Sequence, residues 1–112
     1  MDKKVYGAVD FGATSGRVAE VTLSKEGILD FDVVYRFRDL SVQVFENFYT
    51  CSYAFYAEAL EGLSRLGHKY AEVASIGVDS WGVDFILFDK HDFMVPSHLN
   101  SRAPWEIGRA HV

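Results

Sequence analysis

The chain is poor in the features that mark secreted and membrane-bound proteins. Its single cysteine, Cys51, excludes an internal disulfide, and the start Met-Asp-Lys-Lys is not followed by the apolar stretch of a signal peptide. No apolar run approaches the roughly 20 residues that cross a bilayer. We therefore expect a soluble, cytoplasmic protein.

Positive charge is scarce as well. The 112 residues include 11 lysines and arginines against 16 acidic residues, which gives a net charge of -5. A nucleic-acid-binding surface needs clustered Lys and Arg, so the composition argues against one, although a small anion can still bind locally. The four histidines are scattered, so no zinc site is expected. Apolar material is abundant: 49 % of the residues are hydrophobic and 15 % aromatic, enough for the core of one small domain.

Three segments near the start show the patterns of β-strands. Residues 4–11 form a nearly continuous apolar run, typical of a central strand, and this run ends at Asp10. Residues 17–24 alternate, which predicts an apolar side with Ala19, Val21 and Leu23 and a wet side with Glu20, Thr22 and Ser24. Residues 29–37 alternate too, which places five apolar residues on one face: Leu29, Phe31, Val33, Tyr35 and Phe37. The short turns between these segments predict antiparallel hairpins.

The period changes after residue 50. An amphipathic helix over 52–66, with Gly67 as its stop, is predicted by apolar residues at steps of three and four: Tyr53, Tyr56, Leu60 and Leu63. Residues 73–79 and 83–89 predict two further strands, so the order is βββαββ, an α/β fold with a mixed sheet. If the fourth strand lies parallel to the first, Asp10 and Asp79 emerge at the same edge, where ligands of open α/β sheets bind.

Small and hydroxyl residues follow Asp10 in the order Gly12, Ala13, Thr14, Ser15 and Gly16. Small residues allow close approach, glycine can take a positive φ, and successive N–H groups can form a concave site that fits phosphate. Arg17 would add a charge-assisted contact, and Asp10 would hold Mg²⁺ through waters. The alternative is a tight hairpin whose glycines serve geometry alone, with Asp10 capping a turn. The spacing of a P-loop is absent.

Two stretches resemble a known family. Asp-Phe-Gly-Ala-Thr-Ser-Gly-Arg at 10–17 resembles the first phosphate motif of the actin-like ATPase superfamily, in particular of the FGGY carbohydrate kinases. Ser-Ile-Gly-Val-Asp-Ser-Trp-Gly-Val-Asp-Phe at 75–85 is similar to the corresponding segment of the rhamnulokinases within that family. The resemblance implies a ribonuclease H-like domain, the incomplete N-terminal part of a two-domain kinase. The implied activity is ATP-dependent phosphorylation of L-rhamnulose to L-rhamnulose 1-phosphate.

The resemblance also implies residue roles. Residues 12–17 would line the ATP phosphates, Asp10 would lie near Mg²⁺, and Gly82 would contact the ketose. No catalytic residue is expected in this chain, because the family's aspartate base lies much later and a missing C-terminal domain holds most of the adenine site. The chain alone should therefore be inactive. Its expected partners are the sugar and ATP, with no nucleic acid and no membrane.

Three more residues are candidates for the sugar site because they lie at or just after the end of the fourth strand. Trp81 could stack on a sugar face or fill the core. Asp79 and Asp84 could bond sugar hydroxyls or satisfy turn amides.

The chain departs from the rhamnulokinase pattern in two places. It has Tyr49-Thr50-Cys51 where Tyr-Trp-Asp is usual, and Leu99-Asn100-Ser101 where Tyr-Arg-Asp is expected. Residues 96–112 also lose all periodicity, and residues 107–112 look like a translated sequencing adapter. We expect the kinase domain to occupy residues 1–99 and residues 100–112 to be a non-native tail.

Two other functions compete with the kinase. A ribonuclease H-like nuclease would use Asp10, Glu58 and Asp79 to hold two Mg²⁺ ions, although the acidic net charge and the phosphate-type turn argue against it. A noncatalytic module that binds a sugar or nucleotide is the other possibility.

Overall fold

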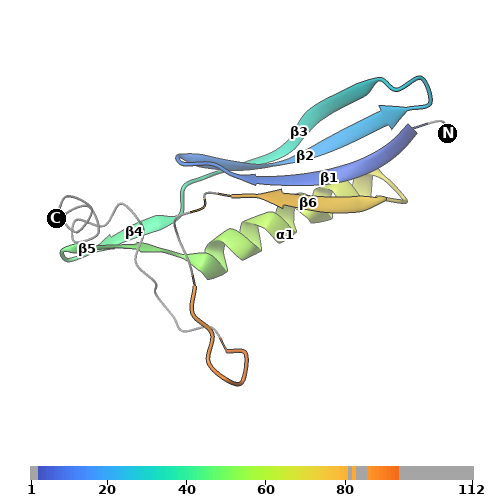
Figure 1. Cartoon of the computed structure of the whole chain (residues 1–112). Coiled ribbons are helices and arrows are strands. Elements are labelled where there is room, and N and C mark those ends of the chain that lie inside the picture. Colours follow the sequence, from blue (N-terminus) through green and yellow to red (C-terminus); the bar gives the residue numbers. More distant parts are fainter. Residues whose placement is uncertain (1–2, 81, 83–85, 94–112) are drawn as a thin grey trace. The chain divides into compact units, whose positions relative to one another are not determined.

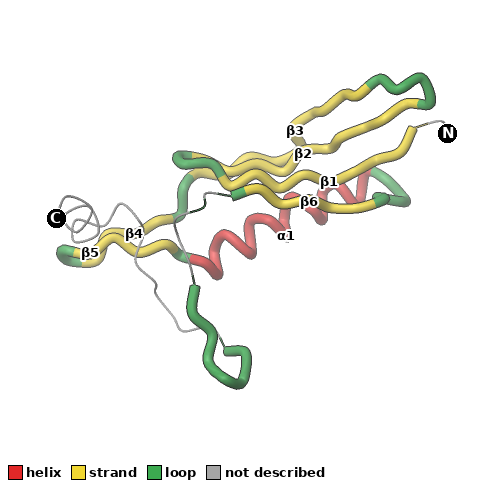
Figure 2. Tube along the Cα trace, in the orientation of Figure 1, coloured by secondary structure: helices red, strands yellow, loops and turns green. Residues whose placement is uncertain are grey.

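The computed structural model describes residues 3–80, 82 and 86–93. Figures 1 and 2 show the elements β1 (Lys3–Phe11), β2 (Ser15–Ser24), β3 (Leu29–Arg38), β4 (Ser41–Val44), β5 (Asn47–Thr50), α1 (Ser52–Lys69) and β6 (Ser75–Asp79). The described residues form two compact units, one of residues 3–39 and 56–80 and one of residues 40–55, 82 and 86–93. Within this part of the chain, no helix combines the length and apolar character needed to cross a membrane.

The first unit is a mixed sheet in the order β3-β2-β1-β6, with α1 along one face (Figure 1). β1 pairs antiparallel with β2 and parallel with β6, as predicted for strands before and after a helical crossover. Asp10 and Asp79 are register partners at the carboxyl ends of β1 and β6. The prediction that they share one edge of the sheet is therefore confirmed.

Close packing between α1 and the sheet depends on two glycines. A Cβ on Gly62 would clash with the side chain of Val18, and a Cβ on Gly7 would lie 3.1 Å from Leu66. Val18 and Leu66 are the largest fully buried side chains of the described residues. Because neither glycine carries a side chain, the helix backbone can approach the strands closely, and the core forms along this contact.

The predicted apolar face of the helix is right only at Leu63, whose side chain lies against β1 near Gly7. Tyr53, Tyr56 and Leu60 are 61 %, 65 % and 48 % exposed, whereas Phe55 and Leu66 are buried. The buried face is centred on the small Gly62, which periodicity of large apolar residues does not detect. The helix also continues through Gly67 to Lys69, so Gly67 is not its stop.

The predicted polar side of β2 is wrong at Glu20, whereas Ala19 on the predicted apolar side is buried as expected. Glu20 is 5 % exposed and lies on the face covered by α1, where it meets Lys69 and Tyr70. Ala19, Val21 and Leu23 lie on the opposite face, which also carries Asp10 and Arg17. We call this second face the open face. Polarity alone does not reveal that a charged side chain is covered by a helix with matching partners.

A β-bulge divides β3 into two halves. Val18 pairs with Tyr35 and Ala19 pairs with Val33, so Val34 is the extra residue. The bulge reverses the side-chain alternation: Val33 lies on the open face, and Tyr35 lies on the helix face. The prediction that all five apolar residues of this strand share a face is therefore wrong.

The element order also differs from the predicted βββαββ. The chain before α1 contains a further hairpin, β4–β5, in the second unit, and the described order is βββββαβ. Of the strand predicted over 83–89, residues 83–85 lie outside the described residues. Residues 86–89 form only an isolated β-bridge at Phe88, beside a turn in which the Asp89 N–H donates to the Phe93 carbonyl.

Candidate functional site

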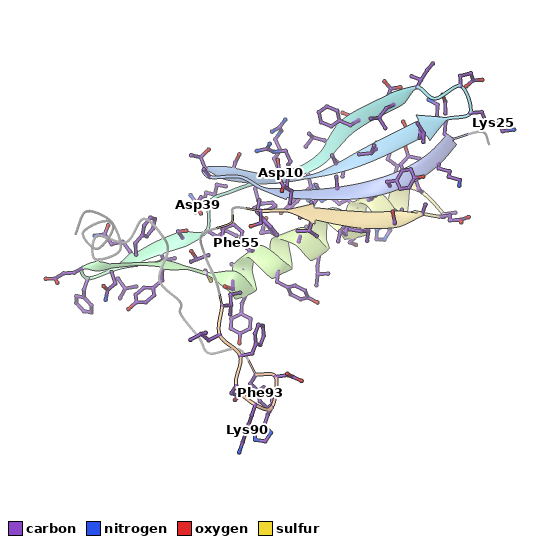
Figure 3. All side chains as sticks on the ribbon, viewed as in Figure 1. Asp10, Lys25, Asp39, Phe55, Lys90 and Phe93 are labelled. Atoms are coloured by element: carbon purple, nitrogen blue, oxygen red, sulfur yellow. The ribbon has the colours of Figure 1, made fainter. Side chains whose placement is uncertain are left out.

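The candidate site starts from an ion pair at the end of β1. Arg17 donates from one terminal nitrogen to the Asp10 carboxylate at 2.8 Å and from the other to the Ser15 hydroxyl at 3.2 Å. The antiparallel register sets Asp10 and Arg17 opposite one another on the open face. Their side chains are 39 % and 31 % exposed, so the pair can be reached from solvent. Figure 3 shows Asp10 at this place, with nitrogen-bearing side chains beside it.

The ion pair belongs to a row of four charges that crosses the sheet. The register partners run Arg36 on β3, Arg17 on β2, Asp10 on β1 and Asp79 on β6. Two arginines therefore lie side by side at one end of the row, and two aspartates lie side by side at the other. Each pair of like charges repels, and a bound ion of opposite charge would relieve the repulsion. The Arg17 side favours an anion, and the Asp79 side favours a cation.

The turn after β1 carries the predicted phosphate motif. The Gly12 N–H donates to the Ser15 carbonyl at 2.9 Å, and the Thr14 carbonyl accepts from the Asp39 N–H at 3.0 Å. A Cβ on Gly12 would lie 2.7 Å from the Ser15 oxygen, so only glycine fits there. Ala13 and Thr14 are exposed at the tip of the turn, where a ligand can approach the backbone.

The glycines of the turn act by their small size. Of the described glycines, only Gly27 has a positive φ, so the left-handed conformation expected in the turn is not adopted. Gly16 is buried, and the Phe37 ring occupies the space that its side chain would fill. Phe37 also packs edge-on against Phe11, with ring centroids 6.0 Å apart. Gly16 thus has a packing role that supports the turn from the helix face.

The predicted sugar-site residues are only partly described. Asp79 is exposed at the end of β6 and adjoins Asp10 in the sheet. Gly82 belongs to the second unit, and no described atom beyond its chain neighbours lies within 4 Å of the place of a Cβ. Trp81 and Asp84 lie outside the described residues.

The three carboxylates of the nuclease alternative do not converge. Glu58 accepts a hydrogen bond from the Tyr35 hydroxyl at 2.7 Å on the helix face, whereas Asp10 and Asp79 lie on the open face. The bond to Glu58 raises the pKa of Tyr35, and the Arg65 guanidinium lies 4.4 Å from the centre of the Tyr35 ring. The position of Glu58 is explained by this contact, and the nuclease is not favoured.

Sequence reasoning missed the buried carboxylate of Glu20. It bonds to the Lys69 ammonium and the Tyr70 hydroxyl. Burial by itself raises the pKa of Glu20, but the bonds from Lys69 and Tyr70 outweigh burial and hold the pKa below 4.5. The bond to Glu20 in turn raises the pKa of Lys69. A lone glutamate in an alternating strand does not indicate such a cluster. The cluster becomes visible only when the structure places the end of α1 beside Glu20.

The residues present fit a phosphate compound with Mg²⁺ better than a metal held by protein alone. Within the described ranges, no three His, Cys, Asp or Glu residues are grouped to hold a metal ion. Mg²⁺ needs only one or two carboxylates beside substrate phosphates, and Asp10 provides one next to a turn that excludes a side chain at Gly12.

Curated proteins of known activity match the chain over most of its length. It is 37 % identical over 106 residues to a rhamnulokinase of Bacteroides thetaiotaomicron, a match that covers 95 % of this chain and 22 % of that protein. It is 31 % identical over 97 residues to the rhamnulokinase of Halalkalibacterium halodurans, covering 87 % of the chain and 20 % of the relative. The rhamnulokinase of Mannheimia succiniciproducens is 34 % identical over 91 residues, covering 79 % and 18 %. No family model matches the chain.

These matches establish the family of the chain. At 37 % identity over 95 % of its length, the chain belongs to a family of carbohydrate kinases. The particular relatives are rhamnulokinases, so the resemblance predicted from the two motifs is confirmed. The chain spans about a fifth of the length of these relatives.

Proposed function

We propose that the chain is the N-terminal part of an ATP-dependent kinase that phosphorylates L-rhamnulose at its primary hydroxyl, giving L-rhamnulose 1-phosphate. The observation that carries this proposal is the similarity to rhamnulokinases over most of the chain. The placement of Asp10 and Asp79 at one sheet edge, next to the turn at 12–16, supports it independently. Phosphoryl transfer depends on such positioning of charge and phosphates rather than on covalent chemistry by the protein.

Each predicted site residue has a role in this proposal. Residues 12–17 bind the ATP phosphates, and Gly12 permits the tight turn because a Cβ there would meet the Ser15 carbonyl oxygen. Asp10 holds Mg²⁺ through water, and a bound Mg²⁺ neutralises charge on the phosphates. Gly82, Trp81, Asp79 and Asp84 form part of the sugar site.

The catalytic base and most of the adenine site belong, in this proposal, to a C-terminal domain in the rest of the protein, because the chain spans only about a fifth of its relatives. The chain alone is then inactive. The boundary at residue 99 stays a prediction, and the sequence of the source gene beyond codon 90 tests it.

The decisive experiment is a kinase assay on the complete protein with a panel of ketoses. We expect ADP release that depends on Mg²⁺ and is fastest with L-rhamnulose. Binding of ATP and sugar without transfer would contradict the proposal and favour a noncatalytic binding module. Cleavage of labelled RNA that is lost in Asp10→Ala would favour the nuclease.

A substitution at Gly82 tests the sugar site. Gly82→Leu should raise the KM for the sugar at least tenfold and the KM for ATP less than twofold, because the leucine clashes with no described atom and would occupy space that this proposal gives to the sugar. An equal rise in both values would indicate a folding defect, and an unchanged KM for the sugar in a folded variant would remove Gly82 from the sugar site.

A further inference from the structure

Arg36 is an arginine that nothing in the proposed reaction yet uses. It is exposed on β3 and is the register partner of Arg17. Its side chain makes no hydrogen bond and no ion pair with any described residue. Arg17, in contrast, is paired with Asp10. The two guanidinium groups therefore face the same region, and only one of them is neutralised.

The β-bulge at Val34 is the reason that Arg36 lies on the open face. The half of β3 before the bulge places odd-numbered residues such as Val33 on this face, and the half after it places even-numbered residues there. Without the extra residue, Arg36 would lie on the helix face. Bulges commonly re-aim a side chain beside an active site. Here the bulge brings a cation to the end of the sheet that carries the turn at 12–16.

Two arginines directly opposite one another on neighbouring strands repel, and the described protein offers Arg36 no carboxylate. An anion above the pair removes this repulsion. A guanidinium group binds phosphate through two parallel hydrogen bonds. Arg17 already donates to Asp10, so it can offer only part of this arrangement. A polyphosphate at the turn would thus meet the partly occupied guanidinium of Arg17 and the unoccupied guanidinium of Arg36.

We propose that Arg36 binds the phosphates of the nucleotide together with Arg17, as a second cationic residue of the phosphate site. This inference rests on the proposed function, because the turn at 12–16 must be the place where the nucleotide phosphates bind. It assigns the phosphate site to two hairpins, β1–β2 and β2–β3, rather than to the turn after β1 alone.

The experiment is titration calorimetry of the complete protein with tripolyphosphate. The variant is Arg36→Gln, and the control is Lys4→Gln, which removes an exposed cation on the same face at the far end of β1. We expect Arg36→Gln to weaken tripolyphosphate binding about tenfold, as the loss of a charge-assisted contact should. Lys4→Gln should change the affinity less than twofold.

Thermal unfolding and steady-state kinetics complete the test. Arg36→Gln should unfold at the same temperature as the wild type or higher, because it removes a repulsion, and it should raise the KM for ATP about tenfold without changing that for the sugar. Unchanged tripolyphosphate binding, equal effects of the two substitutions, or a lower unfolding temperature would overturn the inference. A wild type that binds tripolyphosphate through Arg36 but phosphorylates no sugar would overturn the proposed kinase alone.

Discussion

Two acid–base pairs on neighbouring strands of the same sheet differ in what surrounds them. Glu20 on β2 is buried on the helix face, where the end of α1 supplies Lys69 and the following Tyr70. Asp10 on β1 lies on the open face, pairs with Arg17 and is more than a third exposed. The first pair joins the helix to the sheet. The second can exchange its partner for a ligand, because solvent reaches it and no second element covers it within the described part of the unit.

The comparison predicts that Asp10 matters most for activity. Asp10→Asn in the complete protein should lower Mg²⁺-dependent turnover about a hundredfold or more, because a carboxylate that positions charge at the phosphates is lost. Its free energy of unfolding should change by no more than about 1 kcal/mol, as expected for a partly exposed pair.

Asp30→Asn is the matched control for this prediction. Asp30 is an exposed carboxylate on β3, far along the strand from Arg36, and its loss should change turnover less than twofold. Unchanged turnover in Asp10→Asn would remove Asp10 from the mechanism.

The buried pair should show the opposite pattern. Glu20→Gln keeps the shape of the side chain but removes the negative charge to which Lys69 and Tyr70 donate hydrogen bonds. The substitution should lower the free energy of unfolding by about 2 kcal/mol, measured in a denaturant titration. Because Glu20 lies on the helix face, the KM for ATP should stay within twofold of the wild type. A raised KM with unchanged stability would reverse the roles that we give to the two carboxylates.

The pH dependence of stability sharpens the same contrast. The folded protein holds the pKa of Glu20 below 4.5, so this carboxylate contributes stability above that pH and loses it as the pH falls through the folded value. The stability difference between wild type and Glu20→Gln should therefore shrink as the pH falls below 4.5. Denaturant titrations of both proteins at several pH values would measure it, and a constant difference would contradict the assignment.

The smallest effect is expected at a surface pair on α1. Glu61 accepts from Arg65 one turn later at 3.5 Å, and both side chains are about half exposed, at 51 % and 55 %. Glu61→Gln should change the unfolding free energy by less than about 0.5 kcal/mol, because exposed pairs of this spacing are weak and screened by salt. If Glu61→Gln lowered the free energy of unfolding as much as Glu20→Gln, burial would not explain the difference between the two ion pairs.

Sequence patterns located most of the first unit. The strands around Asp10, the hairpin that follows and the return of β6 beside β1 were all predictable, because hydrophobic period and connection handedness are local or nearly local rules. The β4–β5 hairpin was not predicted. Its turn, Phe45-Glu46, lacks the glycine or asparagine that signals a tight hairpin, and Phe45 adopts a φ of 54° there instead.

The faces of the elements were harder to predict than their existence. Glu20 looks like a wet residue, and Tyr56 looks like a core residue, yet the structure buries the first and exposes the second. Both outcomes depend on which face of α1 packs against the sheet. That face is the one with Gly62, because only a residue without a side chain fits against Val18. No count of apolar residues in one element contains that information.

The sequence by itself determined most segments of the first unit, the resemblance to sugar kinases and the residues that meet at the end of β1, because each depends on the order of residues along the chain. The tertiary structure alone decided which face each residue occupies. One extra residue in β3 and one close helix contact set those faces. They turned Glu20 toward α1 and Arg36 toward Arg17, because burial and charge pairing depend on neighbours that are distant in the sequence.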